Sequence, residues 1–168
     1  VDQEISGIRH ILLQISGLRT GPVSEVVVQR LDERIVEGLH TTLLLLATLL
    51  HEHRIAALSH LLTRSQDGRA RALLLEALEA LLPPAESARV MPLLEYDNSS
   101  ALAAAAARAL GGGLPSFDEA IRETLADPDR LTRTLLAATL DAETLTRVGA
   151  TVQPEGVAGV MGMASERD

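Results

Sequence analysis

The stretch LSHLLTRSQDGRARALLLEALEALL, residues 58–82, predicts two helices joined by a short polar turn. Leucines recur at helical spacing on both sides of the turn, so each helix carries one apolar stripe. The leucines of the two stripes are Leu58, Leu61 and Leu62 before the turn and Leu74, Leu78, Leu81 and Leu82 after it. The turn, residues 65–68, reads Ser-Gln-Asp-Gly, a combination that typically ends a helix. A single hairpin leaves both stripes uncovered, so we expect it to pack against further helices.

Asp67 is expected to cap the second helix of this hairpin. Its carboxylate can accept hydrogen bonds from the amides of the first turn, where the helix dipole also favours negative charge. Arg71 follows four residues later, within reach of the same carboxylate. The same spacing recurs in Asp129 and Arg133. We interpret both pairs as turn caps with a partly exposed ion pair; the alternative is an anion-binding or catalytic pair.

Two later stretches have the same organisation of an apolar helix end, a polar turn and an apolar helix start. They are LEYDNSSALAAAAARAL, residues 94–110, and LADPDRLTRTLLAATL, residues 125–140. With Arg71, Leu102 and Arg133 placed in register, both steps are 31 residues long. A fixed period in this range is typical of a solenoid built from helix pairs. The alternative is that helices rich in Leu and Ala align by chance.

The residues Asp127, Pro128 and Asp129, followed by Arg133, resemble the turn of a HEAT repeat. More narrowly, residues 26–95 resemble the HEAT-repeat region attached to bacterial ADP/ATP translocase-like membrane proteins. This match covers fewer than half of the residues and includes no catalytic motif. It implies an all-α fold, a short right-handed α-solenoid of HEAT-like helical hairpins. It also implies a membrane-associated parent protein, with this part on the cytoplasmic side.

The chain is expected to form one HEAT-like helical repeat domain, residues 1–150, and a glycine-rich C-terminal tail, residues 151–168. The predicted helix before residue 50 is the longest, and its apolar residues are Val27, Leu31, Ile35, Leu39, Leu43, Leu46 and Leu50. Its first half has a polar outer side that includes Arg30 and Arg34, which we expect to face solvent. Its second half is apolar nearly all round, so we expect it to be covered on more than one side. The cover is expected from the first helix and the residue 58–82 hairpin, or from a second copy of the chain.

Composition excludes several kinds of chemistry. All 15 basic residues are Arg, and there is no Lys and no Cys, so lysine Schiff bases, thiol nucleophiles and disulfides are excluded. The net charge of −8 argues against a sequence-independent grip on nucleic acid, which needs a basic surface. Tyr96 and Phe117 are the only aromatic residues, so platforms for stacking bases are lacking as well.

The histidines are the candidates for a metal site. His51 and His53 flank Glu52, and His60 follows one helix later. A metal site needs three or four of these side chains to converge, whereas histidines at a helix end are more often solvated. We therefore predict no cofactor and no metal, with His51, His53 and His60 as the ligand candidates should a metal bind.

These observations predict a non-enzymatic protein–protein interaction or scaffold module with a curved, acidic surface. Its partner is expected to be another protein or the remainder of a longer chain of its own, with no nucleic acid and only an indirect membrane association. The partner contacts are expected on the second helix of the 58–82 hairpin, at Arg69, Glu76 and Glu79. The alternative is a HEAT-scaffold enzyme or ligand-binding protein, either base-excision glycosylase-like or metal-dependent. The expected location is cytoplasmic, and the apolar run 41–50 is too short to span a bilayer.

Overall fold

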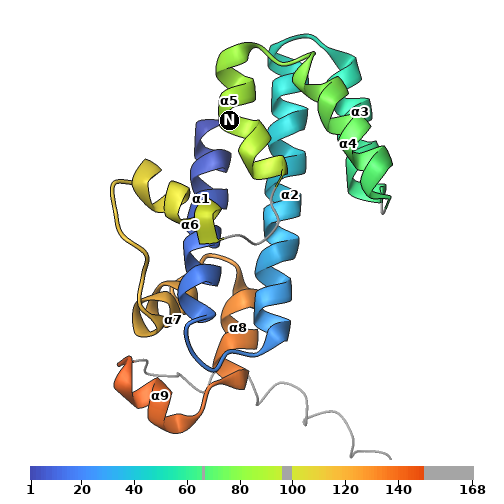
Figure 1. Ribbon diagram of the computed structural model, residues 1–168. Coiled ribbons are helices and arrows are strands. Elements are labelled where there is room, and N and C mark those ends of the chain that lie inside the picture. Colours follow the sequence, from blue (N-terminus) through green and yellow to red (C-terminus); the bar gives the residue numbers. More distant parts are fainter. Residues whose placement is uncertain (66, 96–99, 150–168) are drawn as a thin grey trace, which may run out of the picture.

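The computed structural model describes residues 1–65, 67–95 and 100–149, and within these ranges the chain is all helical (Figure 1). The helices are α1 (Asp2–Leu18), α2 (Glu25–Leu49), α3 (His53–Arg64), α4 (Gly68–Glu79), α5 (Pro84–Leu94), α6 (Ser100–Ala109), α7 (Phe117–Leu125), α8 (Arg130–Thr139) and α9 (Ala142–Arg147). The predicted all-α class is thereby confirmed. The predicted tail, residues 151–168, lies outside the described residues.

The long helices α1 and α2 form an antiparallel hairpin at the centre of the fold (Figure 1). Both have apolar residues at spacings of three and four, which places a continuous stripe on one face of each helix. The largest fully buried side chains of this hairpin are Ile5, Ile8, Leu18, Val27, Val28, Leu31, Ile35 and Leu43. The helices touch closely at Gly38, where an added Cβ would lie 3.0 Å from the Ile8 Cγ1. The core is therefore centred on this pair.

The other helices pack on or beyond different parts of this hairpin (Figure 1). Helices α6 and α7 lie against α1, whereas α3 lies against α2 and carries α4 on its far side. Helix α8 packs against both α2 and α7. Helix α5 contacts α4 and is tied to the start of α1 by an ion pair between Arg89 and Asp2.

The helices that carry the 31-residue period are α4, α6 and α8, and they have different main packing partners. Helix α4 packs on α3 and α5, α6 packs on α1, and α8 packs on α7 and α2. The predicted seam between successive hairpins is therefore not confirmed, nor is the right-handed solenoid. The physical reason is that α1 and α2, with 17 and 25 residues, offer longer apolar stripes than any neighbouring short hairpin.

Four of the described helices, α4, α7, α8 and α9, begin at the capping residues that the sequence supplies. The hydroxyl of Ser116 and the side chain of Glu119 form a complete capping box at the start of α7. Asp67, Asp129 and Asp141 each accept hydrogen bonds from backbone amides in the first turn of α4, α8 and α9. Local helix starts were therefore predictable from single residues.

The second half of α2 is covered less completely than predicted. Leu43, Leu46 and Ala47 are buried, but Leu45 is partly exposed and Leu49 is 66% exposed. Helices α1 and α3 cover one side of this segment, and no described residue covers the other side. No helix in the described part of the chain is long and apolar enough to cross a lipid bilayer.

Candidate functional site

The residues predicted to contact a partner all lie on α4 and are exposed: Arg69, Glu76 and Glu79. Leu73 lies on the same helix and is 60% exposed. Leu78 is the only residue of α4 that is fully buried. A surface helix usually buries a stripe of three to four apolar residues in two turns, so α4 has an incompletely covered apolar face.

The candidate metal ligands do not converge. His51 lies in the α2–α3 turn with a positive φ of 52°, and His53 begins α3, where both are exposed. The ring of His60 lies 4.9 Å from the ring of His40 on α2 rather than near His51 or His53. Within the described residues, no group of three or more His, Asp or Glu side chains is placed to hold a metal ion.

Glu52, which separates His51 from His53, is engaged in capping. Its carboxylate accepts hydrogen bonds from the Arg54 guanidinium, at 2.7 and 2.8 Å, and from the Arg54 backbone amide at 3.2 Å. These hydrogen bonds, the side-chain bonds foremost, lower the pKa of Glu52 to about 2. The carboxylate is therefore an ionised cap of α3 and no proton donor near neutral pH.

The predicted ion pair between Asp67 and Arg71 is not formed. The Asp67 carboxylate accepts from the amides of Arg69 and Ala70, at 3.2 and 3.1 Å. The Arg71 Nη2 instead donates to the backbone carbonyl of Leu94 at 2.8 Å. The physical reason is that both Asp67 oxygens cap the helix, while an unsatisfied helix-end carbonyl of α5 lies within reach of Arg71.

The equivalent pair in the third unit also differs from the prediction. Arg133 does not pair with the Asp129 carboxylate; its Nη1 donates to the backbone carbonyl of Asp127. The carboxylate of Asp127 is buried and pairs with the Arg34 guanidinium of α2 at 2.9 Å, and it also accepts from the Gln14 amide at 3.3 Å. This network joins α1 and α2 to the α7–α8 turn. The Arg34 guanidinium therefore faces this turn and not solvent.

Asp129 belongs to the same network and is strongly stabilised as an anion. It accepts from the Thr132 hydroxyl at 2.6 Å, the Thr132 amide at 3.2 Å and the Arg30 Nε at 3.2 Å. The Thr132 hydroxyl is the main cause that lowers the pKa of Asp129 from its ordinary 3.8 to about 2. All these groups serve to fix α8 on α2, and we assign them a structural role.

This network predicts a specific pH dependence. Because the pKa of Asp129 is lower in the folded state than in the unfolded chain, its ionised form stabilises the fold above the unfolded pKa. That stabilisation is lost as the pH falls through the folded pKa, between roughly pH 5 and 2. In a Thr132→Val variant the pKa of Asp129 returns towards its ordinary value. We therefore expect the variant to be less stable than the wild-type chain at neutral pH. Its stability should then fall less than that of the wild type as the pH is lowered.

Melting temperatures measured by circular dichroism from pH 7 to pH 2.5 would test this expectation. Thr139→Val, an exposed position on the same helix, is the matched control and should keep the wild-type pH profile. Parallel profiles for Thr132→Val and the wild-type chain would show that the Thr132 hydroxyl does not set the pKa of Asp129.

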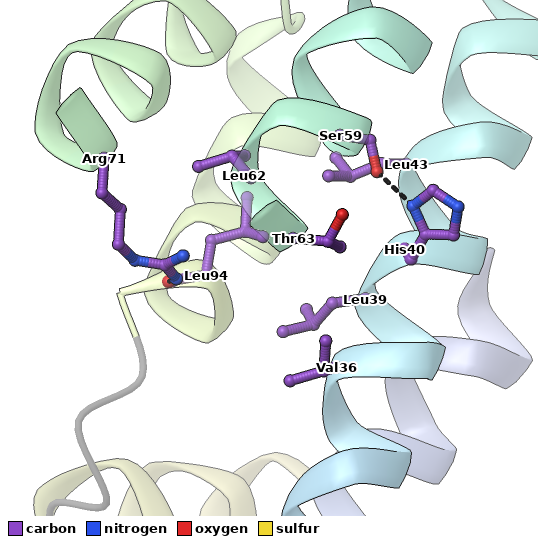
Figure 2. A pocket seen from close by; sticks show the side chains of 9 residues that line it. All are labelled: Val36, Leu39, His40, Leu43, Ser59, Leu62, Thr63, Arg71 and Leu94. Atoms are coloured by element: carbon purple, nitrogen blue, oxygen red, sulfur yellow. Dashed lines mark hydrogen bonds between the residues drawn. The ribbon is translucent and has the colours of Figure 1, made fainter. Parts of the chain in front are cut away.

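The remaining candidate site is a pocket between α2, α3, the start of α4 and the end of α5 (Figure 2). We call it the α2–α3 pocket. Its volume is about 60 Å³, and its walls are mainly aliphatic. The aliphatic side chains that line it are Val36, Leu39, Leu43, Leu62 and Leu94. Val36 is half-exposed, so the pocket has an open mouth next to α2.

Polar side chains form part of the same walls. His40 Nδ1 and the hydroxyl of Ser59 share a hydrogen bond of 2.6 Å that joins α2 to α3 (Figure 2). Ser59 is buried, with 1% of its surface exposed, so its hydroxyl is not presented to a substrate and the pair is no candidate for nucleophilic catalysis. Thr63 and Arg71 complete the lining, and Arg71 spans from α4 to the carbonyl of Leu94 (Figure 2).

Comparisons with protein-family models, with curated proteins and with solved structures find no match. The function must therefore be argued from the residues themselves. The sequence pointed to α4, Arg69, Glu76 and Glu79, but it gave no indication of the α2–α3 pocket. The pocket is built from four helices, and no local spacing relates Val36 to Leu62, Arg71 and Leu94.

Proposed function

We propose that this chain is a non-enzymatic interaction module that binds another protein, or another part of its own longer chain, through α4. The observation that carries the proposal is the apolar face of α4. Leu73 is 60% exposed, while Leu78 alone among the residues of this helix is fully buried. Because covering apolar surface is the main driving force of protein association, a half-covered helix face favours a partner.

The charged residues around Leu73 fit this role. Arg69 precedes it by one turn, and Glu76 follows by one turn, so all three share one exposed face of α4. Interfaces typically combine an apolar centre with a polar rim, and these side chains supply both. Glu79 lies at the end of the same helix and extends the acidic part of the rim.

The HEAT-like solenoid belongs to the same proposal. In a solenoid each hairpin is covered by the next one, and no further hairpin covers the outer face of α3–α4 among the described residues. We infer that the partner, or a further segment of a longer chain, supplies the next layer on α4. A membrane-associated parent protein and a position on its cytoplasmic side remain predictions from the resemblance.

A charge placed at Leu73 tests the proposal. A partner protein would first be isolated from the source lysate on the immobilised chain. We expect its affinity for a Leu73→Asp variant to be at least tenfold lower than for the wild type, which corresponds to about 1.4 kcal/mol. The control is Leu114→Asp, because Leu114 is 52% exposed but lies in the loop before α7. Retention would be measured by quantitative mass spectrometry and then by titration with the purified partner.

Two results would count against this role. Equal retention by wild type, Leu73→Asp and Leu114→Asp would mean that α4 is not the contact surface. A dimer in light scattering that is abolished by Leu49→Asp and not by Leu73→Asp would place the interface on α2 between two copies of the chain.

A further inference from the structure

Arg71 is a cation that lines an apolar pocket, and no carboxylate among the described residues pairs with it. Its Nη2 donates to the Leu94 carbonyl. A guanidinium has five N–H donors in a planar fork, so most of its donors make no hydrogen bond within the described residues. The side chain is half-buried, which strengthens an ion pair relative to one in open solvent.

The surroundings of Arg71 are locally basic although the chain is acidic overall. Arg64 at the end of α3 and Arg69 at the start of α4 also make no ion pair within the described residues. The neighbouring Asp67 carboxylate is occupied by the amides of α4. A negative group is therefore the complementary charge for this end of the α3–α4 hairpin.

The size of the α2–α3 pocket limits what can enter it. Its volume of about 60 Å³ is well below that of sites for drug-sized ligands, roughly 300–1,000 Å³. It gives room for roughly four to six atoms of water size, which corresponds to one branched aliphatic side chain. Figure 2 shows Arg71 on one side of the pocket and Val36 and Leu39 on the other, so an occupant contacts aliphatic walls and the guanidinium together.

We propose that the α2–α3 pocket takes one aliphatic side chain of a partner segment while Arg71 pairs with an Asp or Glu side chain beside it in that segment. This inference rests on the proposed interaction function and specifies the chemistry of the partner. The aliphatic group replaces water against Leu39, Leu62 and Leu94, and the carboxylate accepts from the donors of Arg71 that the described residues leave unused. Neither contact requires the pocket to hold a whole small molecule.

Selection from a random twelve-residue peptide library on the immobilised full chain tests the inference. The enriched peptides should contain Leu, Ile, Val or Met next to Asp or Glu. For one such peptide, we expect the dissociation constant to rise at least tenfold in Arg71→Gln and in Val36→Trp. Arg71→Gln removes the charge but keeps an N–H donor for the Leu94 carbonyl, and Val36→Trp fills the mouth of the pocket.

Arg122→Gln is the matched control, because it removes the same charge from an exposed position on α7 that does not line the pocket. Its peptide affinity should stay within twofold of the wild type. Arg71→Lys keeps the charge without the planar fork and should lie between wild type and Arg71→Gln. Circular dichroism melting of each variant separates a lost contact from a lost fold.

Several results would overturn the inference. Enriched peptides without an acidic residue, equal weakening by Arg122→Gln and Arg71→Gln, or no enrichment at all would each do so. Peptides whose binding is weakened by Leu73→Asp but not by Arg71→Gln or Val36→Trp would rule out the pocket as the binding site. The proposed interaction through α4 would still hold. Saturable binding of octanoate that depends on Arg71, with no peptide enriched, would assign the pocket to a small carboxylate instead. The α4 role is judged separately by partner retention in Leu73→Asp.

Discussion

Replacing Asp127 by alanine should destabilise this protein by about 3–5 kcal/mol, because it removes one partner of a buried ion pair and leaves the other in place. The side chain of Asp127 is 5% exposed and lies 2.9 Å from the Arg34 guanidinium. The substitution also removes the acceptor of the Gln14 amide and of the Asp129 backbone N–H. For a chain of this length, the melting temperature should fall by roughly 6–20 °C.

Two comparisons make this prediction specific. Asp118→Ala breaks the more exposed ion pair with Arg147 and should cost at most about 1 kcal/mol. In Asp127→Ala, Arg34 keeps only the more distant Asp129 carboxylate, at 4.0 Å. The double variant with Arg34→Leu removes this poorly compensated charge as well, so it should be more stable than Asp127→Ala alone. Urea unfolding followed by circular dichroism would measure all three. A double variant as unstable as the sum of its single substitutions would contradict the view that Asp127→Ala leaves the Arg34 charge poorly compensated.

Alanine substitutions at two glycines of α1 should have opposite effects. At Gly17, an added Cβ would lie 2.6 Å from the Ala120 Cβ and 3.1 Å from the Pro115 carbonyl oxygen. Because part of this obstruction is backbone, the cost of overpacking, about 1–3 kcal/mol, should exceed the gain in helix propensity. At Gly7 nothing lies within 4 Å of the added Cβ, so Gly7→Ala should stabilise by about 0.5–1 kcal/mol.

The two variants should therefore differ by about 2 kcal/mol, or roughly 4–8 °C in melting temperature. Scanning calorimetry of Gly7→Ala, Gly17→Ala and the wild-type chain would measure the order of their melting temperatures. Gly17→Ala as stable as Gly7→Ala would mean that α1 and α7 are not in close contact at Gly17.

Local features of this fold could be predicted from the sequence, and long-range ones could not. Leucine spacing predicted the α3–α4 hairpin, and the residues before two of the helices predicted the caps at Asp67 and Asp129. These features depend on residues within one or two turns of one another. The HEAT resemblance supplied an arrangement in space, and the helix packing does not confirm it.

The positions of Arg34 and Arg71 show why the rest was not predictable. Period and polarity placed Arg34 on the outer side of α2, because the sequence does not reveal that the α7–α8 turn covers that side. Spacing placed Arg71 next to Asp67, but a carbonyl of α5, 23 residues away, takes its hydrogen bond. The hydrogen-bond partners of both arginines depend on which helix packs nearby, and a single sequence does not indicate that.

The central position of the α1–α2 hairpin has a consequence for folding during synthesis. Residues 2–49 leave the ribosome before any other described helix, and contacts between helices adjacent in sequence form quickly. The hairpin can therefore act as a template on which α3, α6, α7 and α8 dock as they emerge. An array of equivalent repeats can unravel stepwise from either end. In this chain, unravelling α1 would remove the support of α6 and α7 at once, so we expect these segments to unfold cooperatively.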